Sequence, residues 1–233
     1  MKRQLQYILL LACGAACFSC KKDNLKEPSS TLSGRLVYKG EGFGVEKDQV
    51  PFQLYQYGFG KVAPIAQTFA QDGTYSSVLF DGQYKLIVPN GQGPFLWKQT
   101  AAGNPDTVTI NLNGSQTLDL EVTPYYMIRN PQITVSGGKV NATFKVEQII
   151  TGAAGKAIEN VTLYINRTQF VSGGNNIATA GMSGTAITDP NNITLSVTIP
   201  TITPTQNYVY ARIGLKIAGV EDRIFSPLVQ LTY

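Results

Sequence analysis

The 233-residue sequence contains no histidine. Histidine is the commonest general acid or base and the commonest metal ligand, so its absence excludes Ser-His-Asp and Cys-His nucleophile systems. Charged residues make up only 15% of the chain, and tryptophan occurs once. Glycine and proline are plentiful instead, at 23 and 12 residues. Low charge, many turn residues and few helix formers predict a β-rich protein.

Long apolar runs are scarce as well. Lys2 and Arg3 precede an apolar stretch that begins at Ile8 and continues to about Phe18. A basic start followed by a short apolar region is typical of a secretory signal peptide. This stretch is shorter than the roughly 20 residues that span a bilayer, and no later segment is longer. We therefore expect no transmembrane helix in the mature chain.

All three cysteines, Cys13, Cys17 and Cys20, lie in this first segment. The arrangement resembles a bacterial lipoprotein signal, in which an acylated cysteine becomes the new N-terminus. Cys13 follows the sequence that best fits a lipobox, but cleavage there leaves a very short apolar region. Cys20 ends the apolar run, and we predict it as the lipidation site, with residues 1–19 as the signal peptide. The alternative is an ordinary cleaved signal that discards all three cysteines.

Cleavage before Cys20 limits the chemistry of the mature chain. Its one cysteine is acylated, which excludes disulfides, a thiolate nucleophile and a cysteine-based zinc site. Loss of Lys2 and Arg3 takes the basic groups from 19 to 17 against 15 acidic groups, and the net charge from +4 to +2. With no basic cluster, we expect no nucleic-acid partner.

Sequence motifs for cofactors and metals are absent as well. The chain has no P-loop, EF-hand loop or dinucleotide fingerprint, so we expect no cofactor and no metal. A calcium site built from scattered Asp and Asn side chains stays open.

The remaining chain alternates apolar and polar residues with a period of two, which indicates β-strands. Residues 20–30 are polar and predict a lipidated cysteine on a flexible tether. Asn113-Gly114, between two alternating runs, predicts a β-hairpin. We divide the chain near Pro124 into two β-sandwiches, residues 31–124 and 125–233. The expected strands are Leu32–Tyr38, Val50–Tyr57, Thr74–Val78, Tyr84–Val88, Val108–Leu112, Leu118–Val122, Val140–Ile150, Ile158–Ile165, Ile193–Ile199, Tyr208–Ile217 and Ile224–Leu231.

The first half carries motifs of a known domain type. Thr31–Val37, Asp72–Tyr75 and Phe80–Leu86 resemble the strands of carboxypeptidase-regulatory or transthyretin-like domains. In the last motif, Gly82 predicts a tight turn and Tyr84 a core position. The predicted fold is all-β, with a transthyretin-like sandwich followed by an immunoglobulin-like one.

The whole mature chain resembles Bacteroidetes outer-membrane lipoproteins of unassigned function. The resemblance rests on Glu27–Gly34, Gly93-Pro94-Phe95, Asp106-Thr107-Val108 and Asp119–Tyr125. Such proteins are often encoded beside the SusC/SusD-type outer-membrane pair that imports glycans. The resemblance implies a cell-surface lipoprotein of a polysaccharide-utilisation system, with SusC/SusD-type proteins as partners and contact with the membrane through the lipid anchor only.

Aromatic side chains in a Gly/Pro-rich segment are the candidates for glycan binding. Sugar recognition commonly combines an aromatic face with amide and hydroxyl hydrogen bonds. Trp97 and Phe95 form the predicted stacking platform, with Gln92 beside them. The alternative is that both rings cap the core. Tyr55 and Tyr57 are predicted secondary contacts, although cross-strand packing accounts for them equally well.

The carboxylates argue against catalysis. Asp119 and Glu121 lie two apart on one strand, so both point to the same, solvated face. A glycosidase needs two carboxylates facing each other across about 5–9.5 Å. We therefore predict a non-enzymatic surface lipoprotein that binds a glycan or assists an import complex. The alternative is a scaffold or adhesin-like lipoprotein without its own glycan site.

Overall fold

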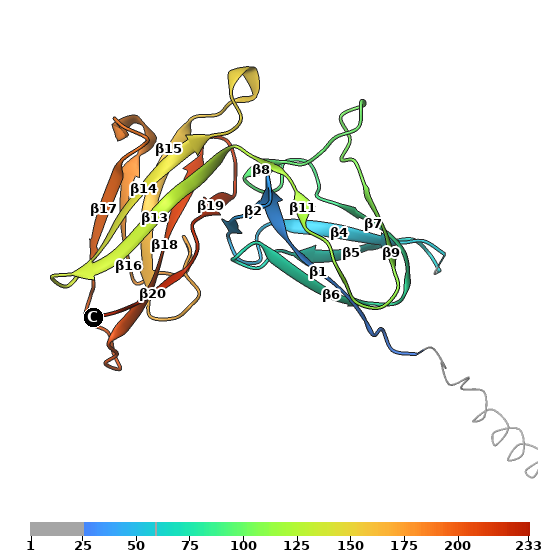
Figure 1. Ribbon diagram of the computed structural model, residues 1–233, viewed down its shortest axis with the longest axis horizontal. Helices are drawn as coiled ribbons and strands as arrows, with labels where there is room; N and C mark the ends of the chain where they lie inside the picture. The colour runs from blue at the N-terminus through green and yellow to red at the C-terminus, as the bar shows by residue number, and fades with distance from the viewer. Residues whose placement is uncertain (1–25, 59) are drawn as a thin grey trace, which may run out of the picture.

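The computed structural model describes residues 26–58 and 60–233 (Figure 1). The predicted signal peptide, the predicted lipidation site Cys20 and residues 21–25 lie outside this range. No helix in the described ranges is long and apolar enough to cross a membrane. Only two short 3-10 helices interrupt the strands there, η1 (Gly152–Ala154) and η2 (Gly184–Ala186). The prediction of an all-β fold is confirmed.

The N-terminal domain is an open sandwich of two sheets. One sheet has the order β10-β1-β11, with β2 and β6 also paired to β1. The other has the order β5-β4-β7-β9, and β8 pairs separately with β12. The strands are β1 (Ser30–Tyr38), β2 (Glu41–Gly42), β3 (Gly44–Val45), β4 (Pro51–Gln56), β5 (Pro64–Thr68), β6 (Thr74–Leu79), β7 (Gly82–Ile87), β8 (Phe95–Leu96), β9 (Val108–Leu112), β10 (Gln116–Thr117), β11 (Leu120–Glu121) and β12 (Thr123–Pro124).

Alternating side chains close this sandwich. Every second residue of β6 is buried, as expected when one face of a strand meets the core. Phe52 of β4 packs edge-on against Tyr75 of β6, with ring centroids 5.1 Å apart, and joins the two sheets. Tyr84 is fully buried directly after Gly82, as the sequence motif predicts. A Cβ at Gly34 would meet the Leu118 carbonyl oxygen at 1.9 Å, so only glycine allows this crossing of strands.

The predicted hairpin at Asn113-Gly114 is wrong. Gly114 does adopt the left-handed conformation of a turn, with φ of 73°. However, β9 before the turn pairs with β7, whereas β10 and β11 after it pair in parallel with β1. The turn therefore carries the chain from one sheet to the other.

The C-terminal domain is a second sandwich. One sheet has the order β13-β14-β17, and the other β16-β15-β18-β19, with β20 also paired to β18. The expected strand Ile224–Leu231 is divided into β19 and β20. The strands are β13 (Tyr126–Ser136), β14 (Lys139–Gln148), β15 (Ile158–Asn166), β16 (Ala178–Ser183), β17 (Ile193–Thr198), β18 (Tyr208–Ile217), β19 (Arg223–Phe225) and β20 (Val229–Thr232). The tandem sandwich prediction is confirmed.

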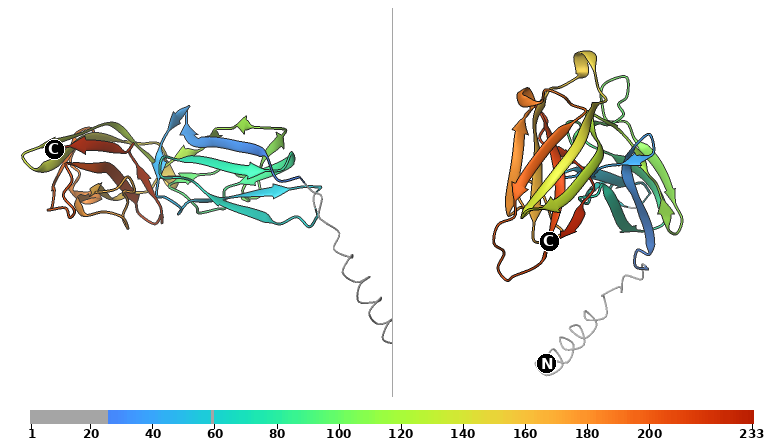
Figure 2. Two further views of the ribbon diagram at one scale, coloured as in Figure 1. Left: turned by 90° about the horizontal axis from the view of Figure 1, so that it is seen from below. Right: turned by 60° about the vertical axis from the view of Figure 1, so that its left-hand side comes forward.

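The two domains lie end to end and share a sheet (Figure 2). The short strand β3 from the N-terminal half pairs with β19, matching Val45 with Ile224 and Gly44 with Phe225. A Cβ at Gly44 would lie 2.8 Å from the Gln71 carbonyl oxygen of the same domain and 3.2 Å from the Phe225 carbonyl oxygen of the other domain, so only glycine fits where β3 meets β19. One buried apolar cluster runs through both domains. The junction is therefore continuous with both cores.

Candidate functional site at the domain junction

The segment around Trp97 is part of the junction. Its strand β8 pairs with β12, the last strand before the C-terminal domain. This pairing leaves only 4% of Phe95 and 6% of Trp97 exposed. The Trp97 Nε1–H donates to the Asp106 carbonyl oxygen at 2.8 Å, and the Lys98 ammonium lies 6.0 Å from the ring centroid. Both rings therefore pack mainly into the protein, and only small parts of them remain accessible.

These small exposed parts line a cleft of about 300 Å³, the "junction cleft". Loop 89–99 of the N-terminal domain forms one wall, and residues 219–221 of the C-terminal domain form part of the other. Tyr125 and Lys156 also line it, with the Lys156 ammonium 5.3 Å from the Tyr125 ring centroid. The complete lining is Pro89, Asn90, Gly91, Gln92, Gly93, Phe95, Leu96, Trp97, Gln99, Tyr125, Lys156, Gly219, Val220 and Glu221.

Three amide side chains also line the junction cleft. The Gln99 Nε2–H donates to Asn90 Oδ1 at 3.1 Å, and the Asn90 amide donates to the Gly103 carbonyl oxygen at 3.0 Å. These bonds hold two exposed amides in place, and the third, Gln92, is half-buried. The lining therefore combines buried aromatic rings with more exposed amides that can donate and accept hydrogen bonds.

A buried carboxylate fixes one wall of the cleft. Asp222, only 6% exposed, lies next to the lining residues Val220 and Glu221. Its Oδ2 accepts the Gly93 backbone N–H at 2.8 Å, which links the C-terminal domain to loop 89–99. Burial raises the pKa of Asp222, against the opposing effect of that hydrogen bond. The loop is thus held by a hydrogen-bond acceptor of the other domain.

The other predicted contacts, Tyr55 and Tyr57, do not line the junction cleft. Tyr55 is half-buried, and its hydroxyl donates to Gln53 Oε1 at 2.7 Å. Tyr57 is 44% exposed, with the Lys85 ammonium 5.3 Å from its ring centroid. The segment after β4 lies at the end of the N-terminal domain that faces away from the C-terminal domain (Figure 1). The structure therefore brings Gln92, Phe95 and Trp97 together and leaves the two tyrosines apart.

The two carboxylates singled out in the sequence lie at the surface. Asp119 and Glu121 are both exposed. Asp119 accepts hydrogen bonds from the backbone and side chain of Arg35, and Glu121 accepts the Lys39 backbone N–H. In the part of the chain that the structure describes, no group of three or more acidic residues could hold a metal ion.

Sequence patterns did not reveal the contribution of the C-terminal domain to the cleft. Lys156 and Asp222 carry no local motif. Lys156 lines the cleft, and Asp222 contacts it only through its hydrogen bond to Gly93. The one available signal for Asp222 was its position just before Ile224, at the start of an expected strand.

The fold and the junction define a two-domain β-sandwich protein with a mixed aromatic and amide cleft. Residues 30–123 match the family model described as "Protein of unknown function (DUF3823) N-terminal domain", and residues 126–230 match "Domain of unknown function (DUF3823_C)". Together the two matches cover most of the chain. The protein belongs to the DUF3823 family. No match was found among curated proteins.

Solved structures of Bacteroidales proteins share this architecture. A DUF3823 family protein from Parabacteroides merdae is 36% identical, with a TM-score of 0.76 over 89% of this chain and 100% of that one. One from Bacteroides ovatus is 29% identical, with a TM-score of 0.75 over 88% and 99%. A Bacteroides uniformis protein described as a "putative carbohydrate binding protein" is 18% identical, with a TM-score of 0.70 over 88% and 100%. This last likeness shows the fold alone.

Proposed function

We propose that this protein is a non-enzymatic lipoprotein of a polysaccharide-utilisation system that binds a glycan in the junction cleft. The observation that carries the proposal is that the aromatic rings of Trp97 and Tyr125 and three amide side chains line one cleft. Sugars present apolar ring faces and hydroxyls, which match aromatic carbon and amide groups. A further support is the same-fold Bacteroides uniformis protein described as a putative carbohydrate binding protein.

Affinity gel electrophoresis against a panel of polysaccharides tests this function. The protein is expected to migrate more slowly in a gel that contains its glycan. Gln92→Ala removes a half-buried amide from the cleft without opening the core, and it should abolish most of the retardation. Trp97→Ala is less suitable, because the ring is buried and its loss opens a cavity.

A matched control separates the cleft from general surface effects. Gln132→Ala removes the same side chain from an exposed position on β13, outside the cleft. It should leave the retardation unchanged. Unchanged migration on every glycan, or equal retardation of the Gln92→Ala variant and the wild type, would remove the junction cleft as a glycan site. Product analysis after long incubation tests the non-enzymatic assignment, and any released sugar would contradict it.

The anchoring at the outer membrane is part of the same proposal. We expect Cys20 to carry the lipid and the protein to face the cell exterior. Cys20→Ser should abolish labelling by radioactive palmitate and move the protein out of the membrane fraction. Cys13→Ser is the matched control and should keep the label. Loss of the label in Cys13→Ser alone would show that Cys13, and not Cys20, is the lipidated residue.

A scaffold role beside a SusC/SusD-type pair is the second candidate. The shared β3–β19 sheet favours it, because the two domains then form one unit of fixed shape that suits a spacer. Co-purification with such a pair from solubilised outer membranes would support this role. A protein that purifies alone and binds a glycan would count against it.

A further inference from the structure

A second cleft, the "arginine cleft", opens elsewhere along the same junction. It has a volume of about 450 Å³ and shares no lining residue with the junction cleft. The N-terminal domain contributes β1, β2 and β6 residues, and the C-terminal domain contributes Arg212 and residues 226–228. The lining is Arg35, Gly42, Phe43, Gly44, Gln71, Asp72, Thr74, Arg212, Ser226, Pro227 and Leu228.

Arg212 is the unusual member of this lining. It lies on β18, is only 1% exposed and has no carboxylate within ion-pair distance among residues 26–58 and 60–233. Its guanidinium lies 3.7 Å from the ring centroid of Phe225. Burial lowers the pKa of Arg212 to about 10, although the group stays charged at neutral pH. A buried cation of this kind is costly unless its hydrogen bonds are satisfied.

Backbone carbonyls satisfy only part of this guanidinium. Nη1 donates to the Gln71 and Val45 carbonyl oxygens at 3.0 and 3.3 Å, and Nε donates to the Val171 carbonyl oxygen. These three acceptors come from both domains and hold the guanidinium plane in place. Nη2 is buried, with almost no surface accessible to solvent, and has no partner within the described residues, so a ligand reaches it only if side chains of the cleft wall shift. The Arg212 guanidinium is thus charged and held in place, and its Nη2–H groups lack an acceptor.

The neighbouring Gln71 side chain has the opposite property, an acceptor without a donor. Its Nε2 donates to the Gln169 carbonyl oxygen at 2.8 Å, which fixes the amide, while its Oε1 is buried and has no partner in the described chain. Four buried side-chain atoms lack partners in those ranges, and two of them belong to residues of this one cleft. A ligand that satisfies both must offer an acceptor for a guanidinium and, close to it, a hydrogen-bond donor.

We propose that the arginine cleft binds a carboxylate-bearing sugar, a uronic acid. The carboxylate would accept from Arg212 Nη2, and an adjacent hydroxyl would donate to Gln71 Oε1. Charge-assisted bonds between arginine and carboxylate are among the strongest that proteins make. The need for an anionic acceptor follows from the cleft itself, whereas the choice of a sugar acid over an acidic peptide rests on the proposed carbohydrate-binding function.

The charge available for an anion in the cleft comes from Arg212. Arg35 also lines the cleft, with half of its side chain accessible, but it is paired with Asp119 at 3.3 Å. Asp72 is the opposing charge. Its Oδ1 accepts the Thr74 backbone N–H at 3.0 Å and the Thr74 hydroxyl at 2.6 Å, so it is held by its own turn. Asp72 therefore does not occupy the free edge of Arg212.

An NMR titration of the isotope-labelled mature chain tests the proposal. The probes are sodium D-glucuronate, sodium D-galacturonate, D-glucose and sodium N-acetyl-L-glutamate, at constant ionic strength. At least one uronate should shift the amide signals of Gly44, Gln71 and Thr74. It should bind on the order of tenfold more tightly than glucose, because the neutral sugar lacks the charged acceptor. Equal binding of glucose, or no shift with either uronate, would overturn the proposal.

Two variants and a control assign the binding to the cleft. Gln71→Met removes Oε1 but keeps the backbone carbonyl that holds Arg212, so it should weaken uronate binding several-fold in a folded protein. Arg212→Lys replaces the planar fork with a point charge and should abolish most binding. Arg223→Lys is the matched control, because Arg223 is a junction arginine outside this cleft. Uronate binding that survives both cleft variants would refute the site.

The N-acetylglutamate titration shows whether the arginine cleft recognises a sugar acid or any carboxylate, independently of the glycan function proposed for the junction cleft. Binding of N-acetylglutamate without either uronate would overturn the sugar assignment while leaving the anion site in place. Retardation on polysaccharides that is lost in Gln92→Ala is a separate readout, since Gln92 lies only in the junction cleft. The two proposals can therefore fail independently.

Discussion

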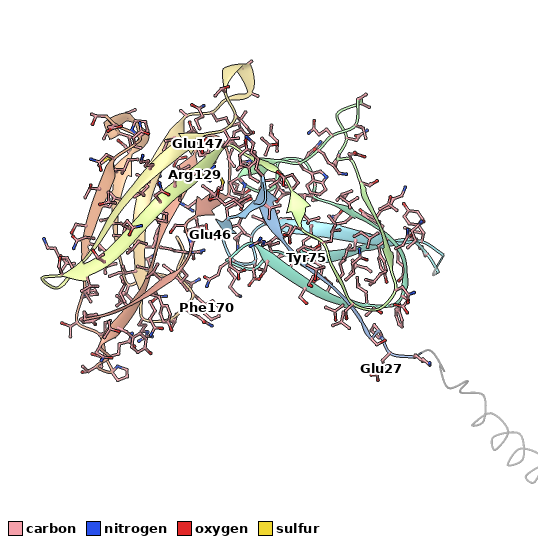
Figure 3. All side chains as sticks on the ribbon, in the orientation of Figure 1. Glu27, Glu46, Tyr75, Arg129, Glu147 and Phe170 are labelled. Atoms are coloured by element: carbon pink, nitrogen blue, oxygen red, sulfur yellow. The ribbon has the colours of Figure 1, made fainter. Side chains whose placement is uncertain are left out.

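The interiors of the two sandwiches and the junction between them are built from different chemistry. The sandwiches bury aromatic and aliphatic side chains such as Phe52, Tyr84 and Phe144. The junction buries Arg212 and Asp222 and adds the Glu46–Arg223 ion pair, with an Nη1–Oε2 distance of 3.2 Å. Figure 3 shows Glu46 between the two domains.

The two kinds of buried side chain contribute differently to the fold. Apolar burial is favourable in many arrangements, so it stabilises the sandwiches without demanding one geometry. Buried charges are favourable only where every hydrogen bond is met, and one missing partner is costly. Glu46, for example, accepts the Gly173 backbone N–H at 3.0 Å as well as binding Arg223. We infer that the junction fixes one orientation of the domains more than it adds stability.

The largest expected effect is in the interior of a sandwich. Phe52→Ala removes a fully buried ring that contacts Phe69 and Tyr75, and should lower the free energy of unfolding by about 3–5 kcal/mol. Chemical denaturation measures this change. Val78→Ala, at a 61% exposed position of β6, is the control and should change stability by about 0.5 kcal/mol or less. Equal losses in the two variants would contradict the packing described for this core.

An intermediate effect is expected at the junction. Arg212→Met leaves the Val45, Gln71 and Val171 carbonyls without this donor and should cost about 1–3 kcal/mol. The loss should be concentrated where the domains meet, so hydrogen exchange should accelerate in β3 and β19 more than in β6. Uniform acceleration along the chain would show that Arg212 supports the whole fold and not the junction.

Asp222 gives a smaller effect that depends on pH. Because burial raises its pKa, the folded state binds more protons than the unfolded state between the ordinary and the raised value. Its contribution to stability is thus complete at low pH and is lost as pH rises through that window. Asp222→Asn keeps an acceptor for the Gly93 N–H, so it should raise the melting temperature at neutral pH. A lower melting temperature for this variant at pH 7 would contradict the raised pKa of Asp222.

The smallest effect is expected on the surface. Arg35 and Asp119 form an exposed pair with an Nε–Oδ2 distance of 3.3 Å. Asp119→Asn removes the charge but keeps an acceptor, and should cost about 0–1 kcal/mol, less at high salt. Denaturation at low and high salt measures it. A loss as large as that of Arg212→Met would erase the distinction between exposed and buried charges in this protein.

Local patterns predicted most of the strands but missed β5, β13 and β16, and the one predicted pairing, the hairpin at Asn113-Gly114, was wrong. Alternation identified the buried faces of β6 and β17, since one face of each strand meets a core. Asn113-Gly114 was correctly placed in a turn, yet a turn signal does not specify which strands pair across it. Here β9 pairs with β7 and β11 pairs with β1, and in each pair the two strands are distant in sequence. Pairing depends on long-range packing, which no short window contains.

The candidate site was predictable to a similar degree. Gln92, Phe95 and Trp97 line the same cleft because one loop carries them all, and that proximity is visible in the sequence. The extent of their burial was not predictable, since the Gly/Pro-rich segment gives no indication that β8 pairs with β12. Arg212 had a usable signal, a single arginine inside the apolar run of β18. Its acceptors on Val45 and Gln71 come from the other domain and had none.

The pairing of β3 with β19 also sets the order of events during synthesis. Position 45 leaves the ribosome long before position 224, so the joint can close only when nearly the whole chain has been made. The N-terminal sandwich can gather its own strands earlier, because their pairing partners lie within the same half, whereas the C-terminal sandwich needs β20, which follows β19 in the chain. Both clefts draw walls from both halves, so neither is complete until the C-terminal domain has been made.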